Sequence, residues 1–346
     1  MKGSQVILGM LDRVRFAAKM VDGQFDDLLI EDLHVLPVGS ILRAVVDRPV
    51  KGIGGAFLRL PSGNGFLRKA SGLTSGQAVL VQVTSCAEDG KAIPLTNRIL
   101  FKSRYCIVTP DVPGLNISRA IKSEDRRDSL TGLAKTGMNG TDMGLIIRSA
   151  AAVADDEAVL DDIAAMRHLA QQVGADTSTK PEVLVEGDDP HTLAWREWSE
   201  ISNVVTDPAA IEASGILESI LSAGNASVPL STGMMYIEPT RALVAVDVNT
   251  GADISPAAPL KANLAAVQDL PRQLRLRGLG GQITIDMAPM TKRDRKPLES
   301  ALRAALRKCP VATEFIGWTP LGHVELKRKR ERVPLGQSVL QAVSAK

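Results

Sequence analysis

The sequence has few aromatic residues and few cysteines. Its 346 residues include only six Phe, three Trp and two Tyr, so any ring that stacks on a ligand can be sought individually. The three cysteines, Cys86, Cys106 and Cys309, are widely separated and match no Cys-x-x-Cys pattern. This spacing argues against both a disulfide framework and a zinc cluster. We therefore expect no structural zinc, and we expect each cysteine to be a small, buried apolar residue.

Long apolar runs are also missing. No stretch approaches the roughly 18 apolar residues that cross a bilayer, although 45% of the residues are hydrophobic. Near the start, Asp12, Arg13 and Arg15 interrupt the apolar stretch that a secretory leader would need. The length suits two or three domains. These features predict a globular, cytoplasmic protein with no membrane partner.

Neither sign of charge is in excess overall, but the charges are unevenly distributed. The chain carries 41 Lys and Arg against 39 Asp and Glu, a net charge of +2. Residues 151–200 contain 12 acidic and 3 basic side chains, whereas residues 271–346 contain 6 acidic and 16 basic ones. The basic C-terminal quarter favours a surface that binds a polyanion, although such runs also occur on ordinary solvated surfaces.

Residues 38–97 predict a small β-barrel. Five short runs of strand-forming residues, separated by glycine, proline and polar turns, have the size and rhythm of a five-stranded OB-type barrel. The turn at 61–65 would bring Phe57 and Phe66 to neighbouring positions, with Lys91 nearby. Rings beside cations are typical of a surface that binds single-stranded nucleic acid. The alternative is that both phenylalanines fill the barrel core.

The rest of the chain predicts a mixture of strands and helices. Strands are expected at 103–108 and 143–149, a long helix at 155–173, a loop at 175–191 and helices over 193–224. The C-terminal third predicts a hairpin at 234–248, a helix at 262–276, a strand at 281–287, a helix at 297–308 and two further strands. A strand, helix and strand in this order form a parallel crossover. Pro271 should kink or restart its helix near Leu270.

Two aspartates end strands of the predicted parallel pair. Asp247 follows the apolar run ALVAV, and Asp286 follows QITI. The crossover brings these strand ends together, and two converging carboxylates suit octahedral Mg²⁺, which retains several waters. Asn249 adds an amide on the same side. The alternative is that each aspartate caps a turn.

Several cations accompany the two aspartates. Arg272 and Arg275 are at helical spacing, and four further cations lie at 292–296. A phosphodiester substrate requires cations beside a metal, so Arg272 and Arg275 are candidate RNA contacts; the alternative is that they are ordinary solvated arginines. The four histidines show no metal-binding spacing, and neither a G-x-S-x-G nor a P-loop segment occurs. Neither a hydrolase triad nor P-loop chemistry is therefore supported.

Four segments of the C-terminal third have a distinctive order and spacing. They are IEPTRALVAVDVNTG, KANLAAV, RQLRLRGLGGQITIDM and GWTPLGHVELKRKRER, and upstream of them lie VDGQ, GAFLRLPSGNGFLRK, GLNISRAI and GLIIRSA. Together they resemble the ribonuclease E/G family over nearly the whole chain. The resemblance implies an α+β multidomain fold: an RNase H-like portion with an inserted S1 (OB-type) β-barrel and 5′-sensor region, followed by a DNase I-like α/β catalytic domain. The implied bounds are 1–37 and 181–230 for the RNase H-like portion, 38–100 for the barrel, 101–180 for the sensor-like region and 231–346 for the catalytic domain.

The resemblance also implies an activity. Asp247 and Asp286 correspond to the metal ligands, and Asn249 corresponds to the residue that orients the scissile phosphate. The implied protein is a Mg²⁺-dependent or Mn²⁺-dependent endoribonuclease of RNA processing or decay. It would cut single-stranded RNA and leave 5′-phosphate and 3′-hydroxyl ends. The alternative is a non-catalytic RNA-binding protein that uses the barrel and the basic C-terminus.

Further roles follow from the same resemblance. Phe57, Phe66 and Lys91 are similar to barrel residues that hold single-stranded RNA. Arg148 and Ser149 occupy the places of two residues that bind a 5′-monophosphate.

The sequence also departs from the family. Ser103 stands where the family has a glycine in the sensor strand, and the chain stops at Lys346 without the CPxCxGxG zinc-link motif. The family's zinc-bridged dimers and tetramers are therefore not expected, and we predict a monomer or a weak dimer. Recognition of a 5′-monophosphate should be weak.

Overall fold

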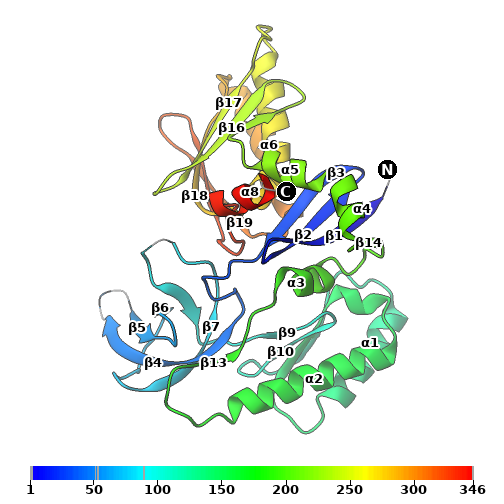
Figure 1. Ribbon diagram of the computed structural model, residues 1–346, viewed down its shortest axis with the longest axis vertical. Helices are drawn as coiled ribbons and strands as arrows, with labels where there is room; N and C mark the ends of the chain where they lie inside the picture. The colour runs from blue at the N-terminus through cyan, green and yellow to red at the C-terminus, as the bar shows by residue number, and fades with distance from the viewer. Residues whose placement is uncertain (1–2, 51, 53, 89, 345–346) are drawn as a thin grey trace. The chain divides into compact units, whose positions relative to one another are not determined.

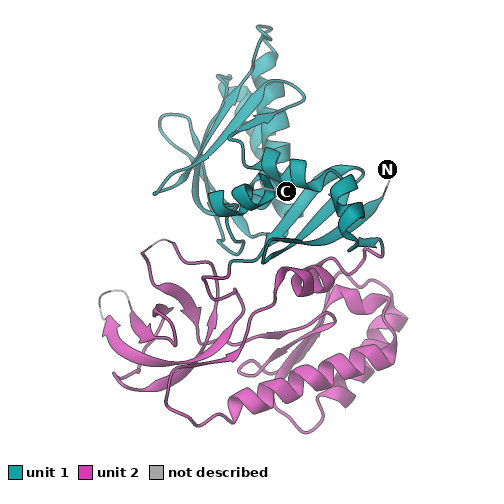
Figure 2. Cartoon of the chain, viewed as in Figure 1, with its two compact units in different colours: residues 1–32, 203–346 teal, residues 33–202 magenta. Residues whose placement is uncertain are grey.

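The computed structural model describes residues 3–50, 52, 54–88 and 90–344. The chain divides into two compact units, Met1–Asp32 with Asn203–Lys346, and Leu33–Ser202 (Figures 1 and 2). The first unit is built from both ends of the chain, and the second is inserted between them. None of the described helices is long and apolar enough to cross a membrane.

The start of the chain forms a small antiparallel sheet in the first unit. Its strands are β1 (Ser4–Leu11), β2 (Val14–Val21) and β3 (Gln24–Ile30), and the short β14 (Val204–Val205) pairs with β1 in parallel. The helices of this part are α4 (Pro208–Ala213), α5 (Ile216–Ala223) and α8 (Gln337–Ser344). Ile7 and Phe16 of the sheet share one buried core with Ile216 and Val339 of these helices. Residues from both ends of the chain are therefore needed to complete this core.

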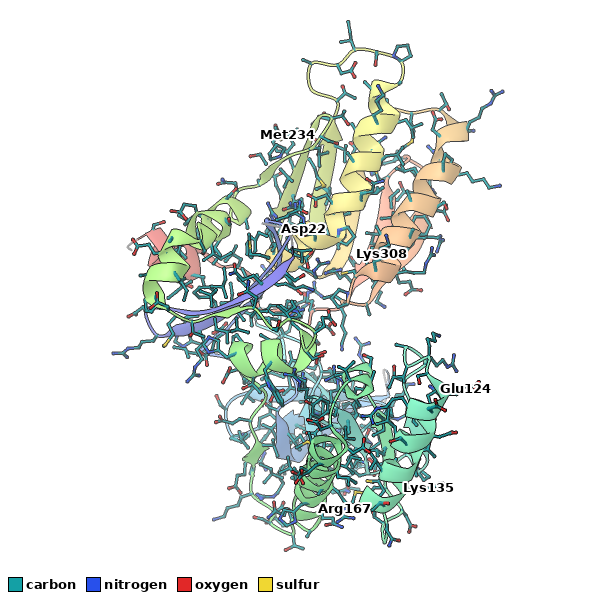
Figure 3. The ribbon with its side chains drawn as sticks, turned by 90° about the vertical axis from the view of Figure 1, so that its right-hand side faces the viewer. Asp22, Glu124, Lys135, Arg167, Met234 and Lys308 are labelled. Carbon is teal, nitrogen blue, oxygen red and sulfur yellow. The ribbon has the colours of Figure 1, made fainter. Side chains whose placement is uncertain are left out.

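A second sheet of six strands completes the first unit. In spatial order these are β15 (Ser227–Pro229), β16 (Met234–Pro239), β17 (Val244–Asn249), β18 (Gly281–Asp286), β20 (Val324–Arg328) and β19 (Thr313–Trp318). The hairpin of β16 and β17 is confirmed. The parallel crossover is confirmed too, because β17 and β18 pair in parallel and α6 (Ala258–Leu276) connects them. The helix α7 (Lys292–Lys308) follows β18 and packs beside α6 (Figure 3).

Alternation along the strands decides which face of this sheet the helices cover. Val246 of β17 and Ile285 of β18 are buried in one core with Leu302 of α7. Successive side chains of a strand point to opposite faces. Asp247 and Asp286, each next to a buried residue, are exposed on the other face.

Pro271 lies inside α6 and does not end it. The helix runs from Ala258 to Leu276, so the predicted restart near Leu270 is wrong. A proline inside a helix costs about 3 kcal/mol relative to alanine. Leu270 and Leu274 are almost fully buried in the core beneath the sheet. Tertiary burial on both sides of the proline therefore offsets the local preference for a break.

The second unit begins with the predicted barrel. Its strands are β4 (Ile41–Val50), β5 (Gly55–Arg59), β6 (Asn64–Arg68), β7 (Ala78–Val83) and β8 (Ile93–Thr96), and pairing of β4 with β7 closes it. The predicted five-stranded, OB-type barrel is confirmed. A sixth strand, β13 (Glu182–Val185), pairs with β4 in a stretch predicted to be a loop. That prediction is wrong because the buried Arg43 binds both Asp176 and Glu182 and so holds this segment against β4.

A four-stranded sheet covered by two helices completes the second unit. The strands in spatial order are β11 (Leu115–Ile117), β12 (Gly144–Ile147), β10 (Cys106–Thr109) and β9 (Phe101–Lys102), and the helices are α1 (Glu124–Gly137) and α2 (Asp156–Gly174). Val108, Leu145 and Ile163 lie in the core between sheet and helices. A 3-10 helix (Ser149–Ala152) follows β12, and α3 (Pro190–Glu197) follows β13.

The cysteines do not all behave as buried apolar residues. Cys106 is fully buried, as predicted, and burial raises the pKa of its thiol to about 12. Cys86 and Cys309 are only partly buried, which corrects the prediction for these two. Burial also disfavours the Cys309 thiolate, but Arg328 and Arg275 outweigh this and lower the pKa, since each donates to Cys309 Sγ at 3.5 Å.

These environments predict a large difference in thiol reactivity. Because the thiolate is the nucleophile, iodoacetamide near neutral pH should modify Cys309 of the folded protein at least about 100-fold faster than Cys106. Mass spectrometry of peptides after timed labelling measures both rates, with the denatured protein as control. Equal labelling of the two thiols in the folded chain would contradict these assignments.

Candidate active site

The two aspartates predicted to share a metal lie directly beside each other. The parallel register pairs the Cα atom of Asp247 with that of Asp286, and the strands end within two residues of this pair. Neighbouring strands lie about 4.8 Å apart, and paired residues point to the same face. Two exposed carboxylates therefore stand side by side at the carboxyl edge of the sheet.

Polar neighbours border the pair on both sides. Asn249 Nδ2 donates to Asp247 Oδ2 at 2.6 Å, which fixes the orientation of that carboxylate. His323 Nε2 lies 3.7 Å from Asp286 Oδ1. Gly233, with φ of 85°, lets the turn before β16 pass beside Asn249, because a Cβ there would collide with the Asn249 carbonyl oxygen. The backbone is thus adapted to keep Asn249 next to the carboxylates.

Tyr236 and His323 also lie at this site, although no motif in the sequence points to them. Tyr236 is the register partner of Asp247 and is 38% exposed as a residue. His323 immediately precedes Val324, the register partner of Ile285. The tyrosine and the histidine therefore lie on either side of the two aspartates, in a row that crosses β16, β17, β18 and the start of β20. No spacing in the sequence could reveal this row, because the order of the strands in the sheet creates it.

The donors at this edge fit Mg²⁺. Adjacent carboxylates repel each other unless a cation lies between them. Mg²⁺ prefers oxygen ligands, is commonly held by one or two carboxylates and retains several waters. Within residues 3–50, 52, 54–88 and 90–344, no group of three or more His, Cys, Asp or Glu side chains is arranged to hold a metal ion. The geometry therefore suits an open site with two carboxylates and not a closed protein cage.

The barrel presents two phenylalanines as a pair. Phe57 of β5 and Phe66 of β6 are register partners, and their ring centroids lie 5.2 Å apart in an edge-to-face arrangement. Both side chains are half-buried, and neither belongs to the buried core of the barrel. Arg48 Cζ lies 5.1 Å from the Phe57 ring centroid. The structure therefore favours the surface arrangement over the alternative in which both rings fill the core.

Lys91 lies in the connection between β7 and β8. Its ammonium is 2.8 Å from a carboxylate oxygen of Glu88, and its side chain is well exposed. An exposed ion pair of this kind contributes little stability. The Lys91 ammonium can therefore exchange Glu88 for another anion at small cost.

Arg148 and Ser149 follow β12, as the sensor assignment requires. Arg148 Nη1 donates to the Ser103 carbonyl oxygen at 2.6 Å, and Nη2 donates to Glu197 Oε2 at 2.6 Å. Ser149 is exposed and begins the 3-10 helix. Burial tends to raise the pKa of Glu197, but Arg148 and Arg196 outweigh this and lower it. An ionised carboxylate therefore occupies donors that the sequence assigned to a phosphate.

Ser103 brings a second carboxylate close to Arg148. The Ser103 hydroxyl donates to Asp162, and the Tyr105 amide donates to the same carboxylate at 2.8 Å. Glu197 thus contacts Arg148 itself, and Asp162 contacts Ser103, whose carbonyl oxygen accepts from Arg148. The charge of the two carboxylates opposes a 5′-phosphate at the sensor position.

Arg272 and Arg275 pack against β3 within the first unit. Arg272 donates to Asp269 at 2.6 Å and to the Phe25 carbonyl oxygen at 2.7 Å. Arg275 is 7% exposed and donates to the backbone and side chain of Asp26. A guanidinium buried among such partners is not open to a phosphate. The geometry therefore favours a role in joining α6 to β3 over the RNA contact predicted for these arginines.

Comparison with known proteins agrees with the family resemblance. The model of the Ribonuclease E/G family matches residues 101–212 and 199–331. The chain belongs to this family, which confirms the identification from the sequence motifs.

Three relatives illustrate the extent of the similarity. A Ribonuclease E from Nostoc sp. is 29% identical over 97% of this chain and 56% of the relative. A Ribonuclease G from Salmonella typhimurium is 28% identical over 74% of this chain and 60% of the relative. A Ribonuclease E/G-like protein from Pyropia yezoensis is 26% identical over 95% of this chain and 75% of the relative. The chain spans little more than half the length of the first two.

The phenylalanine pair generates a test of the barrel surface. Phe57→Ala and Phe66→Ala should each weaken binding of single-stranded RNA by about 1–3 kcal/mol, the usual contribution of a base stack. Fluorescence anisotropy without divalent metal measures the affinity. Leu58→Ala is the matched control in the same strand, because Leu58 is fully buried in the barrel core. It should lower stability by about 2–5 kcal/mol and leave the affinity of the folded fraction unchanged. Unfolding of both Phe variants with unchanged residual affinity would show that the rings are structural.

Proposed function

We propose that this chain is a metal-dependent endoribonuclease that hydrolyses phosphodiester bonds of single-stranded RNA in RNA processing or decay. The observation that carries the proposal is the register pairing of Asp247 with Asp286 on the exposed face of the sheet. Asn249 holds the first carboxylate in place. Membership of the Ribonuclease E/G family supports the same reaction class.

The chemistry follows from the two carboxylates. Mg²⁺, or Mn²⁺ in its place, would supply an activated water and positive charge at the phosphate when Asp247 and Asp286 bind it. Asn249 keeps Asp247 directed toward that position through its 2.6 Å hydrogen bond. The water oxygen attacks phosphorus, the bond to the 3′ oxygen breaks, and the departing oxygen takes up a proton. The products are a 5′-phosphate and a 3′-hydroxyl.

The choice of a single strand follows from the barrel. Bases can stack on protein rings only when they are not stacked and paired in a duplex. Phe57 and Phe66 offer a partly exposed ring pair, with Arg48 over one ring. Lys91 adds an exposed cation on the same barrel. We propose that these residues bind the substrate strand.

The proposed domain division follows the same family likeness. Residues 231–346, which contain both aspartates, would form the DNase I-like catalytic domain. The S1 barrel would span 38–100, and the sensor-like region would span 101–180. The RNase H-like portion would combine residues 1–37 with 181–230.

Removing either metal ligand tests the proposed reaction. Asp247→Asn and Asp286→Asn should each slow cleavage of a fluorescent single-stranded RNA by more than about tenfold, or 1.4 kcal/mol in the barrier. Affinity for RNA in EDTA should stay nearly unchanged, because neither change removes a cation. Asp253→Asn is the control, since Asp253 is exposed in the loop after β17. Cleavage within tenfold of the unchanged protein in either variant would reject the metal assignment. RNA binding with no products in Mg²⁺ would favour the non-catalytic alternative.

The carboxylates around Arg148 make a prediction about 5′ ends. RNAs that differ only in a 5′-phosphate or 5′-hydroxyl should be cleaved at rates within about tenfold of each other. Glu197→Gln should increase the preference for the 5′-phosphate, because it frees the Arg148 guanidinium from an ionised partner. Glu200→Gln is the control, because it removes an exposed carboxylate three residues after Glu197. It should leave the preference unaltered. A strong 5′-phosphate preference in the unchanged protein would contradict this account of the sensor.

A further inference from the structure

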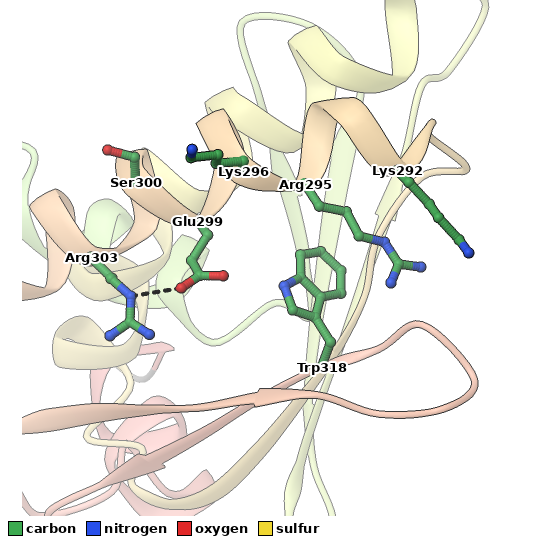
Figure 4. Close-up of a pocket in the computed structure, with 7 residues that line it drawn as sticks. All are labelled: Lys292, Arg295, Lys296, Glu299, Ser300, Arg303 and Trp318. Carbon is green, nitrogen blue, oxygen red and sulfur yellow. Dashed lines mark hydrogen bonds and ion pairs between the residues drawn. The ribbon is translucent and has the colours of Figure 1, made fainter.

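A basic hollow lies on the first unit where α7 runs beside β19. It has a volume of about 490 Å³. Figure 4 shows its lining side chains, which come from one face of α7 and from the end of β19. Its principal residues are Lys292, Arg295, Lys296, Glu299, Arg303 and Trp318. Among the described strands, β19 pairs with β20 alone and forms an edge of its sheet, so none of them closes the hollow from that side.

Three of the four cations that line this hollow have no ion-pair partner in the described part of the chain. Glu299 is the acidic residue of the lining, and its carboxylate accepts a hydrogen bond from Arg303 at 2.9 Å. Among the residues that the structure describes, Lys292, Arg295 and Lys296 have no acidic partner within ion-pair distance. Three cations at successive positions of one helix face repel one another. An anion bound in the hollow would relieve this repulsion.

Arg295 is held in position for such an anion. Its guanidinium carbon lies 4.6 Å from the centroid of the Trp318 ring, which fixes the plane of the group. Its Nε is buried and has no hydrogen-bond partner among the described residues. In Figure 4 the Lys292 and Arg295 side chains extend in the same direction past Trp318. A planar, pre-oriented guanidinium suits bidentate binding of a phosphate group.

The hollow opens at the same edge of the sheet as the two aspartates. Trp318 is the register partner of Val324, and Val324 is the partner of Ile285, the residue before Asp286. Two inter-strand spacings make about 10 Å along this edge. Trp318 lies on the helix-covered face with Val324, whereas Asp286 is exposed on the other face. A strand bound at the aspartates therefore passes around this edge of the sheet to reach the hollow.

We infer that this hollow is a phosphate-binding site for the RNA strand, separate from the barrel and from the aspartates. Arg295 and Lys292 contact a phosphate group some nucleotides from the scissile bond. Trp318 is a positioning residue that holds the Arg295 plane. The inference rests on the proposed function for the identity of the strand, but its test measures binding alone.

The test uses the whole chain in EDTA, so that the RNA stays intact. The probe is a single-stranded RNA of about 30 nucleotides, longer than the roughly 4–16 that one OB barrel covers. Arg295→Gln should weaken binding about tenfold and reduce the slope of log affinity against log salt by about one. Arg307→Gln is the matched control: it makes the same charge change on an exposed residue in the last turn of α7, outside the hollow.

Trp318 variants distinguish positioning from general stability. Trp318→Leu should lose most of the affinity that Arg295→Gln loses, whereas Trp318→Phe, which keeps a ring under the guanidinium, should retain it. Equal affinities and salt slopes for Arg295→Gln and Arg307→Gln would overturn the inference. Cleavage in Mg²⁺ is scored separately. A protein that binds RNA through Arg295 and yields no products would contradict the proposed function and leave the phosphate site supported.

Discussion

The candidate active site depends on the parallel pairing of β17 with β18. Because α6 returns the chain to the edge at which β17 starts, β17 and β18 run in the same direction and both end at the opposite edge. The register there sets Asp247 beside Asp286. Val246 and Ile285, which precede these aspartates, are buried under α6 and α7. A slip of one residue would turn a carboxylate into that core and an apolar residue into water. The hydrophobic core therefore fixes the spacing of the two carboxylates.

The arginines of the basic C-terminal quarter lie in two different environments. Arg275 and Arg328 are almost fully buried, and both donate to Cys309. Arg275 also binds Asp26, so it links the end of the chain to its beginning. Arg295 lies within the same quarter, but it stacks on a ring and meets no carboxylate among the described residues. Burial among hydrogen-bond acceptors makes Arg275 and Arg328 structural, whereas the lack of an acidic partner in the described residues leaves Arg295 able to bind an anion.

The same contrast separates the sensor position from the hollow beside α7. The Arg148 guanidinium could bind a phosphate, but it is paired with Glu197. The neighbouring Ser103 donates to a second carboxylate, Asp162. Arg295 has no such competitor in the described part of the chain. A phosphate must displace a carboxylate at the first position and none at the second. In our proposal, the local acidic partners, more than the arginines themselves, decide which of these positions binds a phosphate.

The sequence by itself determined the barrel, the crossover and the candidate metal ligands. Strand alternation and turn residues are local, and Asp247 and Asp286 end strands whose type can be recognised from short runs. Only the tertiary structure decided what depends on distant partners. Burial of Leu270 kept α6 intact through Pro271, and Arg43 drew a predicted loop into a strand. The order of the strands brought Tyr236 and His323 to the site. The partners of each arginine decided whether it is structural or open to an anion. Such contacts join residues far apart in the chain, so short runs of sequence do not reveal them.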